Sequence, residues 1–122
     1  MVASGQNAPR SGLATDGTDV YWITEGDFPN HLRKAPLAGG PVVDVAVSPS
    51  DASTPQSLIV DATDAYFINP GSPGCGLVKV DLASGTVSTI TLGGSVGCPM
   101  FLAADAANIY YTSSLGITKV AK

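Results

Sequence analysis

The residues of this sequence best suited to chemistry are carboxylates that recur in pairs, three positions apart. The pairs are Asp16 with Asp19, Asp61 with Asp64, and Asp105 with Asn108 in place of a second aspartate. Grouped carboxylates are ligands that Ca²⁺ prefers. Because the pairs recur at the same place in a repeat, and because an asparagine replaces the last aspartate, we interpret them as turn caps. The first Asp of each pair accepts a hydrogen bond from a backbone N–H two residues on, and the second position tolerates the left-handed conformation.

A polar stretch after the first pair is the second candidate site. It holds Glu25, Asp27 and His31, which include the one glutamate and the one histidine of the chain. These side chains can hold a hard cation or a polar ligand, but calcium takes more oxygen ligands than two carboxylates supply, so we favour a solvated loop. A histidine in a loop is usually just solvated, so no catalytic role is expected for His31. The sequence therefore predicts no catalytic residue, no metal site and no cofactor, and the chain is expected not to be an enzyme.

The elements that position these residues recur along the chain. An apolar run, a four-residue turn and a second apolar run with an aromatic pair occur three times, with the first Asp at 16, 61 and 105. The steps are 61 − 16 = 45 and 105 − 61 = 44 residues. A period of about 40–45 residues suits a four-stranded propeller blade. The alternation of apolar and polar residues in the flanking segments predicts half-buried strands.

The repeat divides the chain into an irregular arm at 1–11 and blades at 12–56, 57–100 and 101–122. Three full periods need about 134 residues, and 122 are present. The predicted fold is all-β, a β-propeller segment of about three four-stranded antiparallel blades with the last lacking its own outer strand. That strand comes either from the arm or from a partner chain.

An arc of three blades leaves two apolar sheet faces without a neighbour. Known propellers close with four or more blades. The chain therefore either associates with copies of itself or is an excerpt of a longer propeller. Two copies supply six blades, and a twofold pair is the commonest oligomer symmetry.

Aromatic residues stand in pairs at the same position of each repeat. The pairs are Tyr21 and Trp22, Tyr66 and Phe67, and Tyr110 and Tyr111. Successive side chains of a strand point to opposite faces, so one member of each pair is expected to pack between blades. An exposed aromatic ring can also stack on a sugar, which leaves a lectin site as the alternative to packing.

The two cysteines, Cys75 and Cys98, fall in the connection after the second strand of blade 2 and in the crossing to blade 3. In an up-and-down blade these two connections emerge on the same face of the disc. We therefore predict a disulfide between them, which implies an oxidising compartment. The alternative is two unpaired thiols in a cytosolic protein. Two cysteines and one distant histidine do not have the spacing of a zinc site.

The motifs Asp-x-x-x-x-Tyr-Trp-Ile-Thr, Asp-x-x-x-x-Tyr-Phe-Ile-Asn and Asp-x-x-x-x-Tyr-Tyr-Thr-Ser resemble those of YWTD/NHL-type six-bladed β-propellers. The phrase from Leu32 to Gly40 is similar to the third strand and turn of bacterial members, many of which are predicted secreted or surface proteins. The resemblance covers roughly 12–122. It implies six blades, a central channel and binding at one face of the disc. This chain departs from the family in having fewer than three complete blades.

Composition narrows the possible partners. A net charge of −4 argues against nucleic acid and anionic membrane surfaces, and no apolar run approaches the ~20 residues of a membrane span. We expect a non-catalytic binding or scaffold module that self-associates, with a dimer favoured and protein or glycan as further partners. The alternatives are a lectin-like binder, a structural subunit that polymerises through its blade edges, and a fragment of a propeller hydrolase or lactonase. The expected location is extracellular, periplasmic or on the cell surface, with the leader absent from this sequence.

Overall fold

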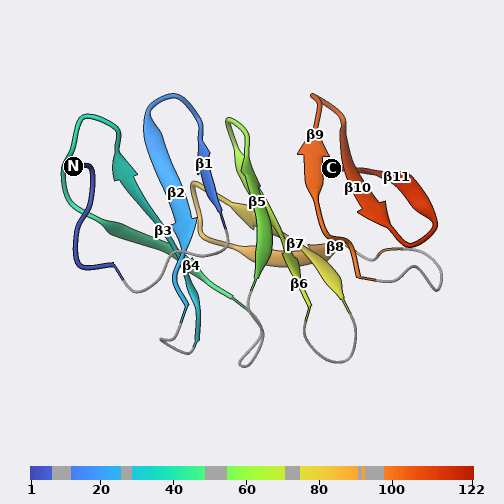
Figure 1. Ribbon diagram of the computed structural model, residues 1–122. Coiled ribbons are helices and arrows are strands. Elements are labelled where there is room, and N and C mark those ends of the chain that lie inside the picture. The colour runs from blue at the N-terminus through green and yellow to red at the C-terminus, as the bar shows by residue number, and fades with distance from the viewer. Residues whose placement is uncertain (7–11, 26–28, 49–54, 71–74, 91, 93–97) are drawn as a thin grey trace.

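The computed structural model describes residues 1–6, 12–25, 29–48, 55–70, 75–90, 92 and 98–122, and these form three antiparallel sheets (Figure 1). Blade 1 consists of β1 (Leu13–Thr15), β2 (Asp19–Ile23), β3 (His31–Pro36) and β4 (Val43–Val47). Blade 2 consists of β5 (Gln56–Val60), β6 (Asp64–Asn69), β7 (Gly76–Asp81) and β8 (Val87–Ile90). Blade 3 consists of β9 (Leu102–Ala104), β10 (Asn108–Ser113) and β11 (Gly116–Ala121).

The strands of each sheet pair in sequence order, so every blade is an up-and-down meander. Blades 1 and 2 have four strands each, and blade 3 has three within the described chain. The predicted all-β propeller segment with an incomplete third blade is therefore confirmed. The described residues contain no helix that is long and apolar enough to cross a membrane.

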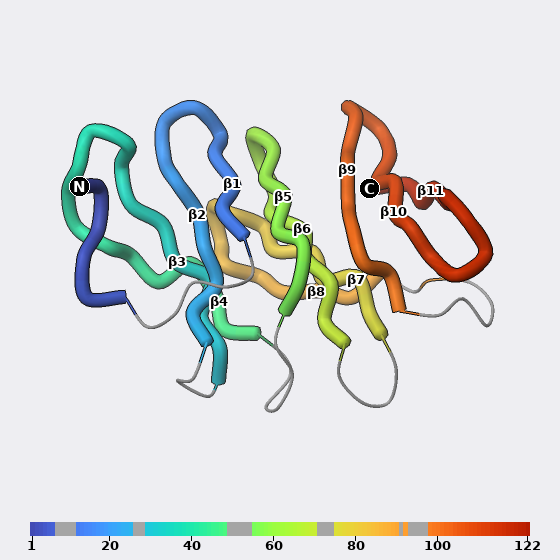
Figure 2. The backbone as a smooth tube through the Cα atoms, viewed as in Figure 1, coloured from blue at the N-terminus to red at the C-terminus, as the bar shows by residue number. Residues whose placement is uncertain are grey.

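The blades stack like the vanes of a fan, with the first strand of each blade on the inside (Figure 1). β1 lies against β5, and β5 lies against β9. The turns that join β1 to β2, β5 to β6, and β9 to β10 all lie along one edge of the fan. Figure 2 shows the two chain ends on opposite sides, with residues 1–6 beside blade 1 and the C-terminus in blade 3.

Two apolar clusters fill the seams between blades. The first joins Tyr21 and Leu32 of blade 1 to Phe67 and Val80 of blade 2. The second joins Tyr66 and Leu77 of blade 2 to Ile109 of blade 3. The first aromatic residue of a blade thus faces the following blade, and the second aromatic residue faces the preceding one. This arrangement follows from the two-residue period of a strand.

Candidate functional site

The three acidic turns at one edge of the fan share one hydrogen-bond pattern. In each, an oxygen of the first Asp accepts two backbone N–H bonds, from residues two and three positions on. The Oδ1 atoms accept from Thr18 and Asp19 at 2.9 Å each, from Thr63 at 3.0 Å and Asp64 at 2.9 Å, and from Ala107 at 2.8 Å and Asn108 at 2.7 Å. These are Asx turns, in which the side chain replaces backbone partners that the tight turn cannot supply.

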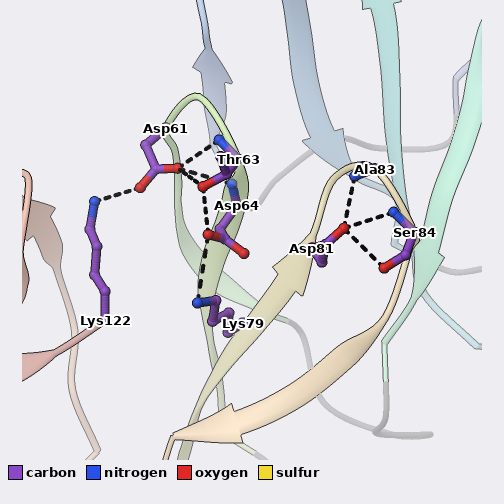
Figure 3. Close-up of polar contacts among 8 residues, drawn as sticks. All are labelled: Asp61, Thr63, Asp64, Lys79, Asp81, Ala83, Ser84 and Lys122. Carbon is purple, nitrogen blue, oxygen red and sulfur yellow. Dashed lines mark hydrogen bonds and ion pairs between the residues drawn. The ribbon is translucent and has the colours of Figure 1, made fainter.

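A fourth turn of the same kind, between β7 and β8, was not predicted from the sequence. Asp81 Oδ1 accepts from the backbone N–H groups of Ala83 at 3.0 Å and Ser84 at 2.7 Å, and from Ser84 Oγ at 2.9 Å (Figure 3). The spacing of three between Asp81 and a small polar residue was the signal that could have identified it.

The second carboxylate oxygen of each turn has a different partner in blade 2 than in the other blades. Tyr21 Oη donates to Asp16 Oδ2 at 2.8 Å, and Tyr110 Oη donates to Asp105 Oδ2 at 2.7 Å. In blade 2 the donor comes from blade 3 instead. Lys122 Nζ lies 2.5 Å from Asp61 Oδ2 (Figure 3). This ion pair crosses the seam between blades 2 and 3.

Hydrogen bonds to these carboxylates keep them ionised. Partial burial acts to raise the pKa of Asp61, but the Lys122 ammonium group and the backbone N–H groups of Thr63 and Asp64 outweigh it and hold this pKa at about 2. The Tyr110 hydroxyl and two backbone N–H groups lower the pKa of Asp105 to about 2. Such groups are poor proton donors near neutral pH. Among the described residues, no three His, Cys, Asp or Glu side chains gather as a metal site would need.

The second acidic position of the turns binds lysine. Lys34 Nζ lies 2.8 Å from Asp19 Oδ2, and Lys79 Nζ lies 3.6 Å from Asp64 Oδ2. Lys79 and Lys122 also stand 5.8 Å and 5.6 Å from the ring centre of Tyr66, within the range of cation–π attraction. Burial, followed by the charges of Asp64 and Asp61, raises the pKa of the Tyr66 hydroxyl to about 12.

The polar stretch of Glu25, Asp27 and His31 is only partly described, because Asp27 lies outside the described residues. His31 Nδ1 stands 3.6 Å from Asp44 Oδ2, and Arg33 Nε stands 2.6 Å from Asp44 Oδ1. Asp44 was not singled out from the sequence. A register shift between Leu32 and Arg33 in the pairing of β3 with β4 accompanies this cluster, and such a shift cannot be inferred from sequence spacing.

The predicted disulfide is present. Cys75 and Cys98 are bonded, with their Cα atoms 5.1 Å apart. Cys75 directly precedes β7, and Cys98 lies shortly before β9, so the bridge stands at the edge opposite the acidic turns. It fastens the crossing into blade 3 to the body of blade 2.

The aromatic pairs lie in the seams or on the two end faces of the arc. Trp22, Phe67 and Tyr111, the second members of the pairs, are all buried. Among the first members, Tyr21 and Tyr66 are buried in the seams, whereas Tyr110 lies on the outer face of blade 3 beside a cavity of about 290 Å³.

Equivalent leucine and isoleucine positions are buried inside the arc and exposed at its two ends. On the face toward the following blade, Leu32 is 2% exposed and Leu77 0%, but Ile117 is 80% exposed. On the face toward the preceding blade, Leu58 is 6% exposed and Leu13 69%. Blade 3 and blade 1 therefore each have an exposed end face. Its apolar residues occupy positions that are buried where two blades meet inside the arc.

Comparison with known proteins identifies the architecture. A chain in the crystal structure of a nidogen/laminin complex matches with a TM-score of 0.74 and 19% sequence identity. The match covers 97% of this chain and 44% of that one, so the present chain spans less than half of its neighbour's length. No family model and no curated protein matches the sequence. The chain has a β-propeller-like fold.

Proposed function

We propose that this chain is a non-catalytic binding and scaffold module of the six-bladed YWTD/NHL type, and that its two end faces join it to a second copy to complete six blades. The bacterial secreted or surface type and an extracellular location belong to the same proposal. The Cys75–Cys98 disulfide supports an oxidising compartment. The neighbour's presence in a protein complex supports protein as the class of further partner.

The observation that carries this proposal is the outer face of blade 3. Four large apolar residues on or beside this blade are more than half exposed: Met100, Phe101, Leu115 and Ile117. Burying a large apolar side chain contributes about 1.5–3 kcal/mol. Phe101 and Ile117, which line the cavity on this face, together contribute about 3–6 kcal/mol, against the ~4–15 kcal/mol that association costs. A concentration-dependent complex is therefore expected from this face.

Two of the rival functions have less support. A lectin-like site needs an exposed aromatic ring in each blade, but Trp22, Phe67 and Tyr111 are buried. A hydrolase or lactonase needs carboxylates that are available to a metal or a substrate, whereas Asp16, Asp61 and Asp105 each hold hydrogen bonds on both oxygens. A filament would use the same end faces as a closed pair. The two are distinguished by mass, which keeps growing with concentration for a filament and stops at two chains for a pair.

Light scattering across a dilution series tests the proposal. The 12.3 kDa chain is expected to approach twice its mass with rising concentration and then to plateau. Ile117→Asp should shift this transition to at least tenfold higher concentration, because a carboxylate cannot be buried in an apolar seam without a partner. Ser88→Asp, on an exposed position of β8, is the matched control. A mass that stays at one chain throughout would refute self-association, and a mass that keeps growing would indicate a filament.

A further inference from the structure

The residue just after the third strand of each blade occupies an equivalent place in all three blades. Leu37, Leu82 and Lys122 each donate a backbone N–H to the third residue of their own blade's acidic turn. The acceptors are the carbonyl oxygens of Thr18 at 2.9 Å, Thr63 at 2.9 Å and Ala107 at 3.1 Å. This position therefore projects from the same site of each blade, independently of any sequence alignment.

In the two internal seams this residue contacts the preceding blade. Whether it is a lysine or a leucine correlates with the partner of the first Asp in the acidic turn of that preceding blade. Lys122 binds Asp61 of blade 2 directly. Leu82 packs against the cluster that contains Tyr21, and Tyr21 donates to Asp16 instead. Where this residue is a leucine, the Asp of the preceding blade accepts from its own tyrosine. Where it is a lysine, the lysine takes the place of the tyrosine as the partner of that Asp.

The acidic turn of blade 3 has the tyrosine–aspartate hydrogen bond that is found opposite a leucine. Tyr110 donates to Asp105 at 2.7 Å, as Tyr21 does to its own turn. The unused leucine of this set is Leu37 on blade 1, which is 45% exposed. One end face thus carries a tyrosine–aspartate hydrogen bond and the other carries a leucine. These are the two features that meet in the seam between blades 1 and 2.

The face of blade 1 that carries Leu37 is covered by the N-terminal residues. Val2, Ala3 and Gln6 line a cavity of about 270 Å³ over this face, together with Trp22. The cover is loose. Arg33 Nη1 donates to Gln6 Oε1 at 3.3 Å, whereas the buried Trp22 Nε1 has no hydrogen-bond partner among the described residues. A blade face would fill this space as Tyr21 and its neighbours pack against Phe67.

We infer that the Trp22 face of blade 1 is the seat for the Tyr110 face of blade 3 of a second copy, and that residues 1–6 occupy this seat as a displaceable cover. The inference rests on the proposed self-association. It adds which faces meet: at both contacts, blade 3 of one copy packs head to tail against blade 1 of the other. Two such contacts close a twofold ring with blade 3 of each copy against blade 1 of the other. Association then exchanges the N-terminal residues for a blade.

A double-mutant cycle tests the register. Leu37→Lys should bring an ammonium group to Asp105 of the second copy, as Lys122 reaches Asp61, and so tighten the pair about tenfold. Asp105→Asn retains the turn cap but removes the charge, so Leu37→Lys in that background should give no gain. Ala83→Lys, at the exposed equivalent turn of blade 2, controls for the change in net charge. Equal effects of the two lysine variants, or a gain that persists with Asp105→Asn, would overturn the inferred register while leaving self-association intact.

The single tryptophan of the chain reports the cover. Deleting residues 1–6 should shift Trp22 emission to the red in dilute solution, tighten association several-fold, and restore the blue-shifted emission as the mass doubles. Val2→Asp should act in the same direction without shortening the chain, and circular dichroism checks that the sheets persist. A Trp22 emission wavelength that does not change as the mass doubles would refute the exchange of residues 1–6 for a blade of the second copy. A single-chain mass for every variant would instead refute the proposed function itself.

Discussion

Replacing Lys122 by methionine should weaken the seam between blades 2 and 3 in a pH-dependent way. The ammonium group bonds Asp61 Oδ2 at 2.5 Å and stands 5.6 Å from the ring centre of Tyr66. Methionine keeps an apolar chain of similar length over the ring but removes the charge and the donor. The neighbouring turn retains its backbone hydrogen bonds from Thr63 and Asp64, so the variant is expected to fold.

The magnitude follows from the exposure of the pair. The Lys122 side chain is 15% exposed and that of Asp61 31%. The pair therefore falls between surface ion pairs, which contribute about 0.2–1 kcal/mol, and bonds to charged groups, which contribute about 1.5–3 kcal/mol. The fall in the pKa of Asp61 from 3.8 to about 2 corresponds to about 2.5 kcal/mol in favour of the charged form, after the cost of its burial has been subtracted. Backbone N–H groups account for part of this, so we expect a loss of about 1–1.5 kcal/mol at pH 7.

Urea unfolding at pH 7 and pH 2 measures the effect. Because the pKa of Asp61 is lowered in the folded chain, its stabilisation is present above the ordinary value of 3.8 and is lost as the pH falls toward about 2. The difference between Lys122→Met and the parent chain should therefore shrink at the lower pH. Lys119→Met, on an exposed position of β11, should change stability by less than about 0.5 kcal/mol. An equal loss at both pH values would refute the ion-pair account and leave only packing over Tyr66.

Two further changes probe the loops and turns that hold the blades together. Replacing Cys75 and Cys98 by serine removes a bridge between residues 23 positions apart and should lower the free energy of unfolding by about 3 kcal/mol, measured in urea; an unchanged midpoint would contradict this. Gly85→Ala should destabilise the chain by about 2 kcal/mol or more, because φ is +72° and the added Cβ would lie 2.6 Å from the carbonyl oxygen of Val45 in blade 1. Gly17→Ala, with φ +92° and no atom within 4 Å of the added Cβ, carries the backbone strain alone and should lose about 1 kcal/mol. Equal losses at the two glycines would show that the Val45 carbonyl yields freely.

Local chemistry in the sequence was sufficient to predict the blades. A turn that opens with Asp fixes its own backbone, and the alternation of side chains along a strand then decides which residues face inward. Strand order therefore followed from the 44–45 residue repeat. The disulfide was also predictable, because the parity of strands places the connections of Cys75 and Cys98 on one edge of the sheet.

The contacts between blades could not be obtained this way. The sequence does not distinguish Tyr110, on the outer face of blade 3, from Tyr66, which is buried with two ammonium groups near its ring, since both stand in the same motif. The ion pair of Asp61 with Lys122 joins residues 61 positions apart, and the approach of His31 to Asp44 accompanies a register shift between strands. The stacking of complete sheets sets the distance between Asp61 and Lys122, and the pairing of β3 with β4 inside blade 1 sets that between His31 and Asp44. The repeat determined what each blade is, and the tertiary structure decided which blade faces are filled and which remain open.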